Sequence, residues 1–175
     1  MNLTPTQRAN TKRLIAALRS GKYQRCEQYL RTEDGFCPWG IACDVIDPTR
    51  WSHSDLTENI FYYGGDPDDL ESKEFFAPTE DVALAYGDLT RATFTSSDLH
   101  KVLPRFTADE SKATGPWSIV ELNDNFHLTL SETADVLEEL FLTGNYLGGK
   151  PEEKEPYDYV ADDFAFDAAR EQRFK

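Results

Sequence analysis

The stretch from Glu121 to Glu132 contains the side chains whose types and spacing come closest to a metal site. A calcium-binding loop supplies oxygen ligands at positions one, three, five, seven, nine and twelve, and it turns at a glycine in position six. With Glu132 at position twelve, Phe126 replaces this glycine and cannot easily make the turn. A glutamate at position one is also too long for the usual tight geometry. We therefore expect no bound metal and no cofactor; the residues at ligand positions are Glu121, Asn123, Asn125, Thr129 and Glu132.

His127 and Thr129 form a His-x-Thr sequence that resembles one half of the active site of two-histidine phosphoesterases. That chemistry needs two such motifs, because one imidazole acts as the base and the other as the acid. His53 and His100 are not followed by a hydroxyl residue two positions later. We therefore interpret the single motif as a coincidence.

Cys37 precedes Pro38 at a predicted helix start, where the helix dipole would lower the pKa of a thiol. A nucleophilic cysteine would also need a nearby base, which the sequence does not identify. Cys26, Cys37 and Cys43 are separated by eleven and six positions, and these spacings match no common zinc site. Buried, reduced thiols are the simpler interpretation of three cysteines, and they suit a reducing cytoplasm.

The composition is that of one globular domain, with 175 residues of which 39% are hydrophobic and 13% aromatic. No run of 18 or more apolar residues is present, so we predict no membrane span and no membrane partner. The first 31 residues carry seven Lys/Arg and one acidic residue, a balance of +6, within a net charge of −14. The other 144 residues therefore carry −20. Such an acidic surface repels phosphate, so we do not expect direct nucleic-acid binding outside the N-terminal helix.

Caps, helical spacing and stop residues predict about five helices and a small antiparallel hairpin or sheet, which define a compact, mostly helical α+β domain. The expected hairpin lies within 23–37 around Asp34-Gly35, and a strand is expected at 60–63. We expect the helix from Pro38 to Ile46 to be the central one. The domain should span residues 1–147 and be followed by an acidic, aromatic C-terminal arm at 148–175. The other predicted helices begin near Thr4-Pro5, Thr79, Ser96-Asp98 and Thr129, and residues 107–115 are predicted to be a surface loop.

Two blocks of sequence resemble a family of small uncharacterised proteins of bacteriophages and their hosts. The first contains Gly21-Lys-Tyr23 and then Cys37-x-x-Gly40-Ile-x-Cys43-Asp. The second contains Leu122-Asn-Asp124 and then Glu132-x-Ala-Asp135. Here Pro-Trp replaces the second Cys and the Leu of the family's Cys-Cys-Leu-Gly pattern, and the middle and the tail have no counterpart. The resemblance implies a viral setting and carries over no activity.

We expect a non-enzymatic phage accessory protein that binds a host, defence or virion protein in the host cytoplasm or the virion. An acidic nucleic-acid mimic that blocks a DNA-binding enzyme, and a small cysteine- or histidine-dependent hydrolase or transferase, remain open alternatives, as does a homo-oligomer. The contact surface is predicted in the acidic middle and the arm, at Asp66, Asp68, Asp69, Glu71, Tyr157, Tyr159, Phe164 and Phe166.

Overall fold

The computed structural model describes residues 3–54, 59–65, 75–104, 106 and 116–143. Within these residues the chain forms helices around two small antiparallel sheets, so the predicted α+β class is confirmed. The predicted domain boundary at 147, the loop 107–115 and the arm 148–175 lie outside the described residues. So do all eight predicted contact residues, which are Asp66, Asp68, Asp69, Glu71, Tyr157, Tyr159, Phe164 and Phe166.

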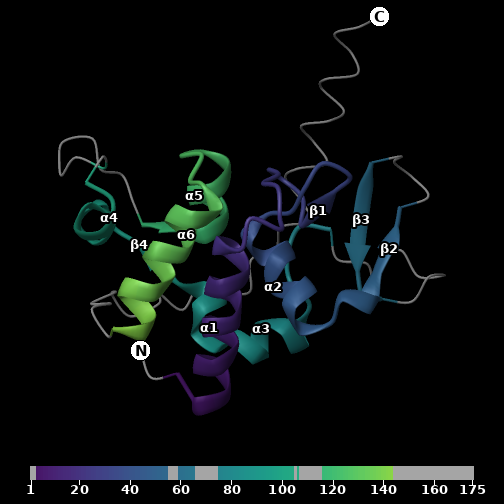
Figure 1. Cartoon of the computed structure of the whole chain (residues 1–175), viewed down its shortest axis with the longest axis horizontal. Helices are drawn as coiled ribbons and strands as arrows, with labels where there is room; N and C mark the ends of the chain where they lie inside the picture. The colour runs from purple at the N-terminus through teal and green to yellow at the C-terminus, as the bar shows by residue number, and fades with distance from the viewer. Residues whose placement is uncertain (1–2, 55–58, 66–74, 105, 107–115, 144–175) are drawn as a thin grey trace, which may run out of the picture.

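Helix α1 (Pro5–Arg19) stands in the middle of the molecule and packs against α2 (Pro38–Ile46), α3 (Glu80–Tyr86) and α6 (Leu130–Leu137) (Figure 1). It begins where predicted, because Thr4 and Gln7 form a capping box in which each side chain accepts a hydrogen bond from the other residue's backbone N–H. It ends before Gly21, whose φ of 71° is easily adopted by glycine. The side chains that α1 buries are Thr11, Leu14, Ile15 and Leu18.

Helix α2 (Pro38–Ile46), which we expected to be the central helix, lies beside α1 (Figure 1) and is deeply buried, with every residue from Pro38 to Cys43 buried. Its first turn packs directly on the backbone of Leu30, whose carbonyl accepts a hydrogen bond of 3.0 Å from the N–H of Cys37. A Cβ atom built on Gly40 would lie 1.7 Å from that carbonyl oxygen. Glycine is therefore required here by the close approach of two backbones.

The larger sheet has the strand order β1-β3-β2, built from β1 (Arg31–Thr32), β3 (Ile60–Tyr63) and β2 (Trp51–His53). The predicted strand at 60–63 is confirmed as its centre. The predicted hairpin forms as one antiparallel bridge between Arg31 and Phe36, on either side of the turn Thr32–Gly35. The strand β1 also pairs with β3, a partner that the prediction did not include. The sheet lies at one end of the long axis of the molecule (Figure 1).

The remaining elements cover the other end and the base of the molecule (Figure 1). Helix α4 is capped by Thr95 with Asp98, one residue earlier than the predicted Ser96. The 3-10 turn η1 (Pro48–Arg50) leads into β2. The other elements are α3 (Glu80–Tyr86), η3 (Gly87–Arg91), β4 (Thr93–Phe94), α4 (Ser96–Val102), β5 (Trp117–Ser118), α5 (Ile119–Asp124), α6 (Leu130–Leu137) and the π-helix η4 (Glu138–Leu142).

Residues Ile119–Asp124 form helix α5, which was not among the predicted helices. Ser118 and Glu121 cap this helix with a capping box, and a second capping box at Thr129 and Glu132 starts α6 as predicted. Leu122 and Leu128 point into the core on either side of a short connection. Two capped helices therefore occupy most of the stretch that resembles a calcium loop.

Candidate functional site

The two blocks that carry the family resemblance meet in space at a junction between the loop before β1 and helix α5. The side-chain amide of Asn123 donates a hydrogen bond of 2.9 Å to the carbonyl of Cys26. The guanidinium of Arg25 donates one of 2.8 Å to the carbonyl of Asn123. Asn123 is fully buried, and its side-chain oxygen has no hydrogen-bond partner among the described atoms. The Leu-Asn-Asp motif therefore joins α5 to the N-terminal block.

A carboxylate at the rim of this junction holds both a guanidinium and an imidazole. Glu27 Oε1 accepts a hydrogen bond of 2.6 Å from Arg25 and lies 2.8 Å from Nδ1 of His127. These contacts, that of His127 first, lower the pKa of Glu27. Gln28 and His127 have positive φ angles of 69° and 51°, and they are the two non-glycine residues with positive φ in the described chain. Backbone strain of this kind needs support from surrounding contacts, which the Glu27 pair supplies.

The residues predicted at calcium-ligand positions do not converge on one point. The carboxylates of Glu121 and Glu132 accept hydrogen bonds from the N–H groups of Ser118 and Thr129, at 2.6 and 2.9 Å, in the caps of two different helices. Asn123 points into the core, and Asn125 is exposed at the end of α5. Within the described part of the chain, no group of three or more His, Cys, Asp or Glu side chains is arranged to hold a metal ion.

The three histidines lie in separate places and have different neighbours. His53 on β2 packs edge-on against Phe61, with ring centres 5.1 Å apart. Nδ1 of His100 lies 2.6 Å from the carbonyl oxygen of Phe106, and His127 contacts Glu27. His127 therefore belongs to a surface contact with Glu27, at a residue whose backbone has a positive φ angle.

The cysteines are buried and free, and the predicted lowering of the Cys37 pKa is wrong. Cys37 does cap α2, and its Sγ accepts a hydrogen bond of 3.4 Å from the N–H of Gly40. However, desolvation outweighs this contact and raises the pKa of Cys37 to about 12. Burial likewise raises the pKa of Cys26 to about 11. Both thiols are thus protonated at neutral pH, the opposite of the environment that a cysteine nucleophile requires.

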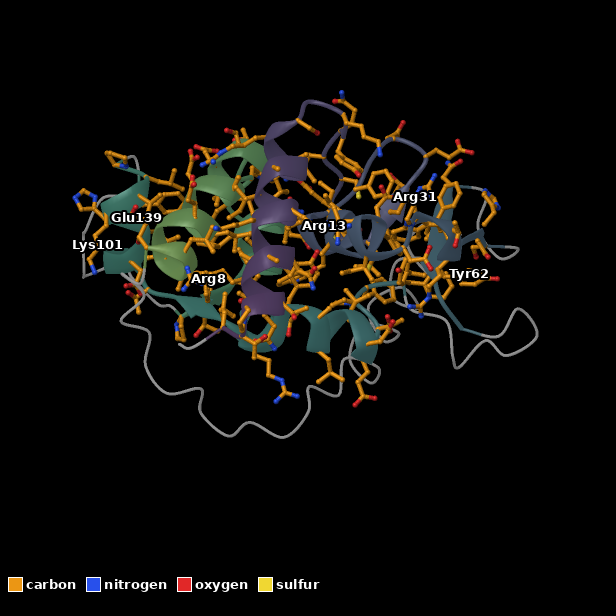
Figure 2. All side chains as sticks on the ribbon, turned by 60° about the horizontal axis from the view of Figure 1, so that its bottom comes forward. Arg8, Arg13, Arg31, Tyr62, Lys101 and Glu139 are labelled. Carbon is orange, nitrogen blue, oxygen red and sulfur yellow. The ribbon has the colours of Figure 1, made fainter. Side chains whose placement is uncertain are left out.

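The basic face of α1 is largely used inside the molecule. Arg8 donates to the carbonyl of Leu142 at the end of η4, at 3.0 Å, and Arg13 donates to the carbonyl of Val45 near the end of α2, at 2.7 Å. Figure 2 shows Arg8 and Arg13 extending from α1 toward these two neighbouring elements. Arginine at the C-terminus of a helix satisfies free carbonyls and suits the dipole. Arg8 and Arg13 therefore cap the ends of two neighbouring helices, although both residues are exposed.

Arg31 lies in an aromatic site on the larger sheet, which motif analysis of the sequence missed. Its guanidinium carbon is 4.1 Å from the ring centre of Phe61, 4.9 Å from that of Phe36 and 5.4 Å from that of Trp51. We call these four residues the Arg31 site. Figure 2 shows Arg31 at the same end of the molecule as Tyr62, far from Lys101. The strand register explains the arrangement, because Arg31 pairs with Phe61, and Trp51 is on the same face of the sheet. The only signal in the sequence was the density of aromatic residues around this strand.

Tyr62 points to the opposite face of the sheet and begins a chain of four aromatic rings, which we call the aromatic ladder. The ring centres are 5.8 Å apart for Tyr62 and Phe75, 6.2 Å for Phe75 and Phe76, and 5.2 Å for Phe76 and Tyr29. The N–H of Leu30 donates a hydrogen bond of 2.7 Å to the carbonyl of Phe75 and fixes the ladder to the strand. Phe76 remains 49% exposed. An apolar ring is thus held in a fixed orientation at the surface.

Residues 7–141 match the family described as "Domain of unknown function (DUF8296)", and the chain belongs to this family. The match includes the whole of the junction, the Arg31 site and the aromatic ladder. No curated protein and no solved structure matches the chain. None of the helices in its described residues is long and apolar enough to cross a membrane.

Proposed function

We propose that this protein is a non-enzymatic accessory protein that acts by binding another protein, and that it works in a bacteriophage or prophage setting. The viral setting and the location in the host cytoplasm or virion rest on the motif resemblance. The binding role is supported by one structural observation, the half-exposed Phe76 within the aromatic ladder.

A rigid aromatic side chain at the surface is well suited to anchor a protein interface. Binding would lose little further conformational entropy at Phe76, because its ring packs on Tyr29 and its neighbour Phe75 is hydrogen-bonded to Leu30. Burying the remaining apolar area then contributes about 25 cal/mol per Å². Interfaces commonly concentrate their binding energy in such aromatic anchors. The other large exposed apolar residue of the described chain, Leu84, is 67% exposed and stands alone on α3.

The Cys37 thiol gives the alternative of a cysteine enzyme little support, since it is buried and protonated. The nucleic-acid mimic would depend on acidic residues between 55 and 81, most of which lie outside the described residues. Asp66, Asp68, Asp69 and Glu71 remain predicted contact residues, and so do the aromatic residues of the arm.

Photo-crosslinking from the ladder tests the proposal directly. A photoreactive phenylalanine analogue at position 76 should crosslink to one defined protein in infected cells, whereas the same analogue at position 84 should not. The variant Phe76→Ser should lose this partner on affinity purification, and Leu84→Ser, which removes a more exposed apolar side chain, should retain it. Equal crosslinking from both positions, or a partner that Phe76→Ser retains, would overturn the role assigned to the ladder.

A further inference from the structure

The end of the molecule that contains the larger sheet has three cations stacked on aromatic rings, and two of them also contact a carboxylate. Lys22 Nζ lies 3.6 Å from Asp44, and Arg50 donates to Asp81 at 2.5 Å. Arg31 is the third cation. Among the described residues, none accepts a hydrogen bond or forms an ion pair with its guanidinium. Of the three cations, Arg31 is therefore the one whose charged group has no carboxylate of the described chain in direct contact.

Burying a guanidinium that has no carboxylate in contact costs free energy. The Arg31 side chain is partly buried among apolar rings, and this burial lowers the pKa of the guanidinium. A guanidinium has five N–H donors and no acceptor, and it stays charged at all physiological pH values. The rings compensate for part of the lost hydration through cation–π contacts. They offer no hydrogen-bond acceptor, so the donors of the Arg31 site are free to meet a ligand.

We propose that the Arg31 site recognises a carboxylate on a partner protein, in a segment where the acidic residue is next to an aromatic or aliphatic side chain. The planar fork of a guanidinium matches a carboxylate with two parallel hydrogen bonds. The rings of Phe36, Trp51 and Phe61 supply apolar surface for the neighbouring side chain of the ligand. This inference rests on the proposed function and adds the chemistry of the partner.

The charge of the chain favours an acidic peptide over a nucleic acid. The chain carries a net charge of −14, which repels a polyanion over most of the surface. A nucleic acid would need several free cations along its backbone, and Arg8, Arg13 and Arg19 are held by their own molecule. A single carboxylate needs one guanidinium. The carboxylate of Asp44 interacts electrostatically with Arg31, but it already accepts hydrogen bonds from Tyr23 and Trp51 at 2.6 and 3.2 Å.

The test is a titration of the full chain with a capped peptide of sequence Ser-Phe-Glu-Phe-Ser, followed by nuclear magnetic resonance. The indole N–H of Trp51 and the backbone N–H groups of Arg31 and Phe61 should shift together and saturate. The matched peptide with glutamine in place of glutamate should bind at least tenfold more weakly. This comparison uses the unaltered protein, so it does not depend on whether a variant folds.

Three variants then assign the effect to the guanidinium. Arg31→Gln should weaken binding of the glutamate peptide at least tenfold, and Arg31→Lys, which keeps the charge but loses the fork, should give an intermediate loss. Arg91→Gln removes an exposed arginine elsewhere and should change the affinity less than twofold. Thermal unfolding of each variant would show that the fold is retained.

Equal affinity for the glutamate and glutamine peptides, or unchanged binding by a folded Arg31→Gln variant, would overturn the proposal. Tighter binding at Trp51 by inorganic phosphate or by a twelve-residue oligothymidine than by the peptide would overturn the carboxylate assignment. None of these results depends on the crosslinked partner of Phe76. Failure of the peptide titration therefore does not contradict the proposed function. Failure of the Phe76 crosslinking does not change the interpretation of the peptide titration.

Discussion

The side-chain nitrogen of Asn123 lies 2.9 Å from the main-chain oxygen of Cys26, a residue 97 positions earlier, and donates a hydrogen bond to it. The same nitrogen lies 2.7 Å from the carboxylate of Asp124. Asn123 is fully buried, so removal of its amide leaves the Cys26 carbonyl without this donor in a site that water does not reach. This contact joins helix α5 to the loop before β1.

Asn123→Ala should therefore lower the free energy of unfolding by about 1–3 kcal/mol, the cost of leaving a buried polar group unpaired. Urea denaturation followed by fluorescence measures the change. Asn125→Ala, an exposed amide two residues later, is the matched control and should stay within about 0.5 kcal/mol of the parent protein. If Asn123→Ala and Asn125→Ala had the same free energy of unfolding, the hydrogen bond to Cys26 would contribute no measurable stability.

Gly40→Ala should reverse the usual effect of replacing glycine in a helix. Alanine normally stabilises a helix interior by about 1 kcal/mol relative to glycine. At Gly40 the new methyl group would meet the Leu30 carbonyl at 1.7 Å, so the two backbones must separate and break the hydrogen bond from Cys37. We expect a loss of more than about 2 kcal/mol, within the range for overpacked cores. Ala16→Gly on the exposed face of α1 is the companion variant, and it should lose only about 1 kcal/mol. A Gly40→Ala protein as stable as its parent would show that the backbones of Gly40 and Leu30 are not in close contact.

Most helices could be predicted from the sequence because their signals are local. Thr4 with Gln7 and Thr129 with Glu132 cap their own helices within three residues, so the caps were visible in the sequence. Helix α5 was missed because it has only six residues, and its polar Glu-Leu-Asn-Asp sequence matched the spacing of a calcium loop. The burial of Leu122 depends on the tertiary fold and is not visible in the local sequence.

The chemistry of the sites was less predictable, because it depends on contacts between distant segments. The position of Cys37 at a helix start was correct, but its pKa follows burial, which a local sequence pattern does not show. Arg31 receives rings from β2, from β3 and from the turn before α2, and each looks like an ordinary core residue in the sequence. The Asp34-Gly35 turn was predicted correctly, but the pairing of the preceding strand β1 with β3 was not predicted.

Arg19 forms a fork between α1 and the last turns of the α6–η4 helix. Its two terminal nitrogens lie 2.5 Å from Asp135 and 2.6 Å from Glu138. These side chains are between 37% and 47% exposed, so solvent screens the pair and Arg19→Ala should cost less than about 1 kcal/mol. The loss should shrink in 1 M NaCl. Lys12→Ala, an exposed cation on the same helix, should show no comparable dependence on salt in urea denaturation.

The native thiols should resist alkylation. Burial raises the pKa of Cys26 to about 11 and that of Cys37 to about 12, so the reactive thiolate is scarce at pH 7.5 as well as shielded. Ala16→Cys adds a thiol on the exposed face of α1 as an internal reference. Maleimide labelling monitored by mass spectrometry should modify this thiol on the order of a hundredfold faster than the native ones, since each pKa unit lowers the thiolate fraction tenfold. In urea all four should react alike. Rapid labelling of Cys37 in the folded protein would contradict its burial.

The buried thiols, together with the buried phenol of Tyr63, predict that the protein loses stability at alkaline pH. Cys26, Cys37 and Tyr63 have folded pKa values of about 11, 12 and 12, against 9.0, 9.0 and 10.0 ordinarily, and burial is the leading cause for each. Above about pH 9 the unfolded chain therefore releases protons that the folded chain retains, so the free energy of unfolding falls as the pH rises. The stabilisation is fully present below pH 9 and is lost progressively toward pH 12.

Urea midpoints measured at pH 8.0 and pH 10.5 should show this decrease. Cys37→Ala removes one of the three groups, so its midpoint should fall less between the two pH values, even though the variant starts from a lower stability because of the cavity it creates. Comparing the pH-dependent difference within each protein separates the titration from that cavity. A midpoint that is constant or rises between pH 8.0 and pH 10.5 would mean that these groups are as hydrated in the folded protein as in the unfolded chain.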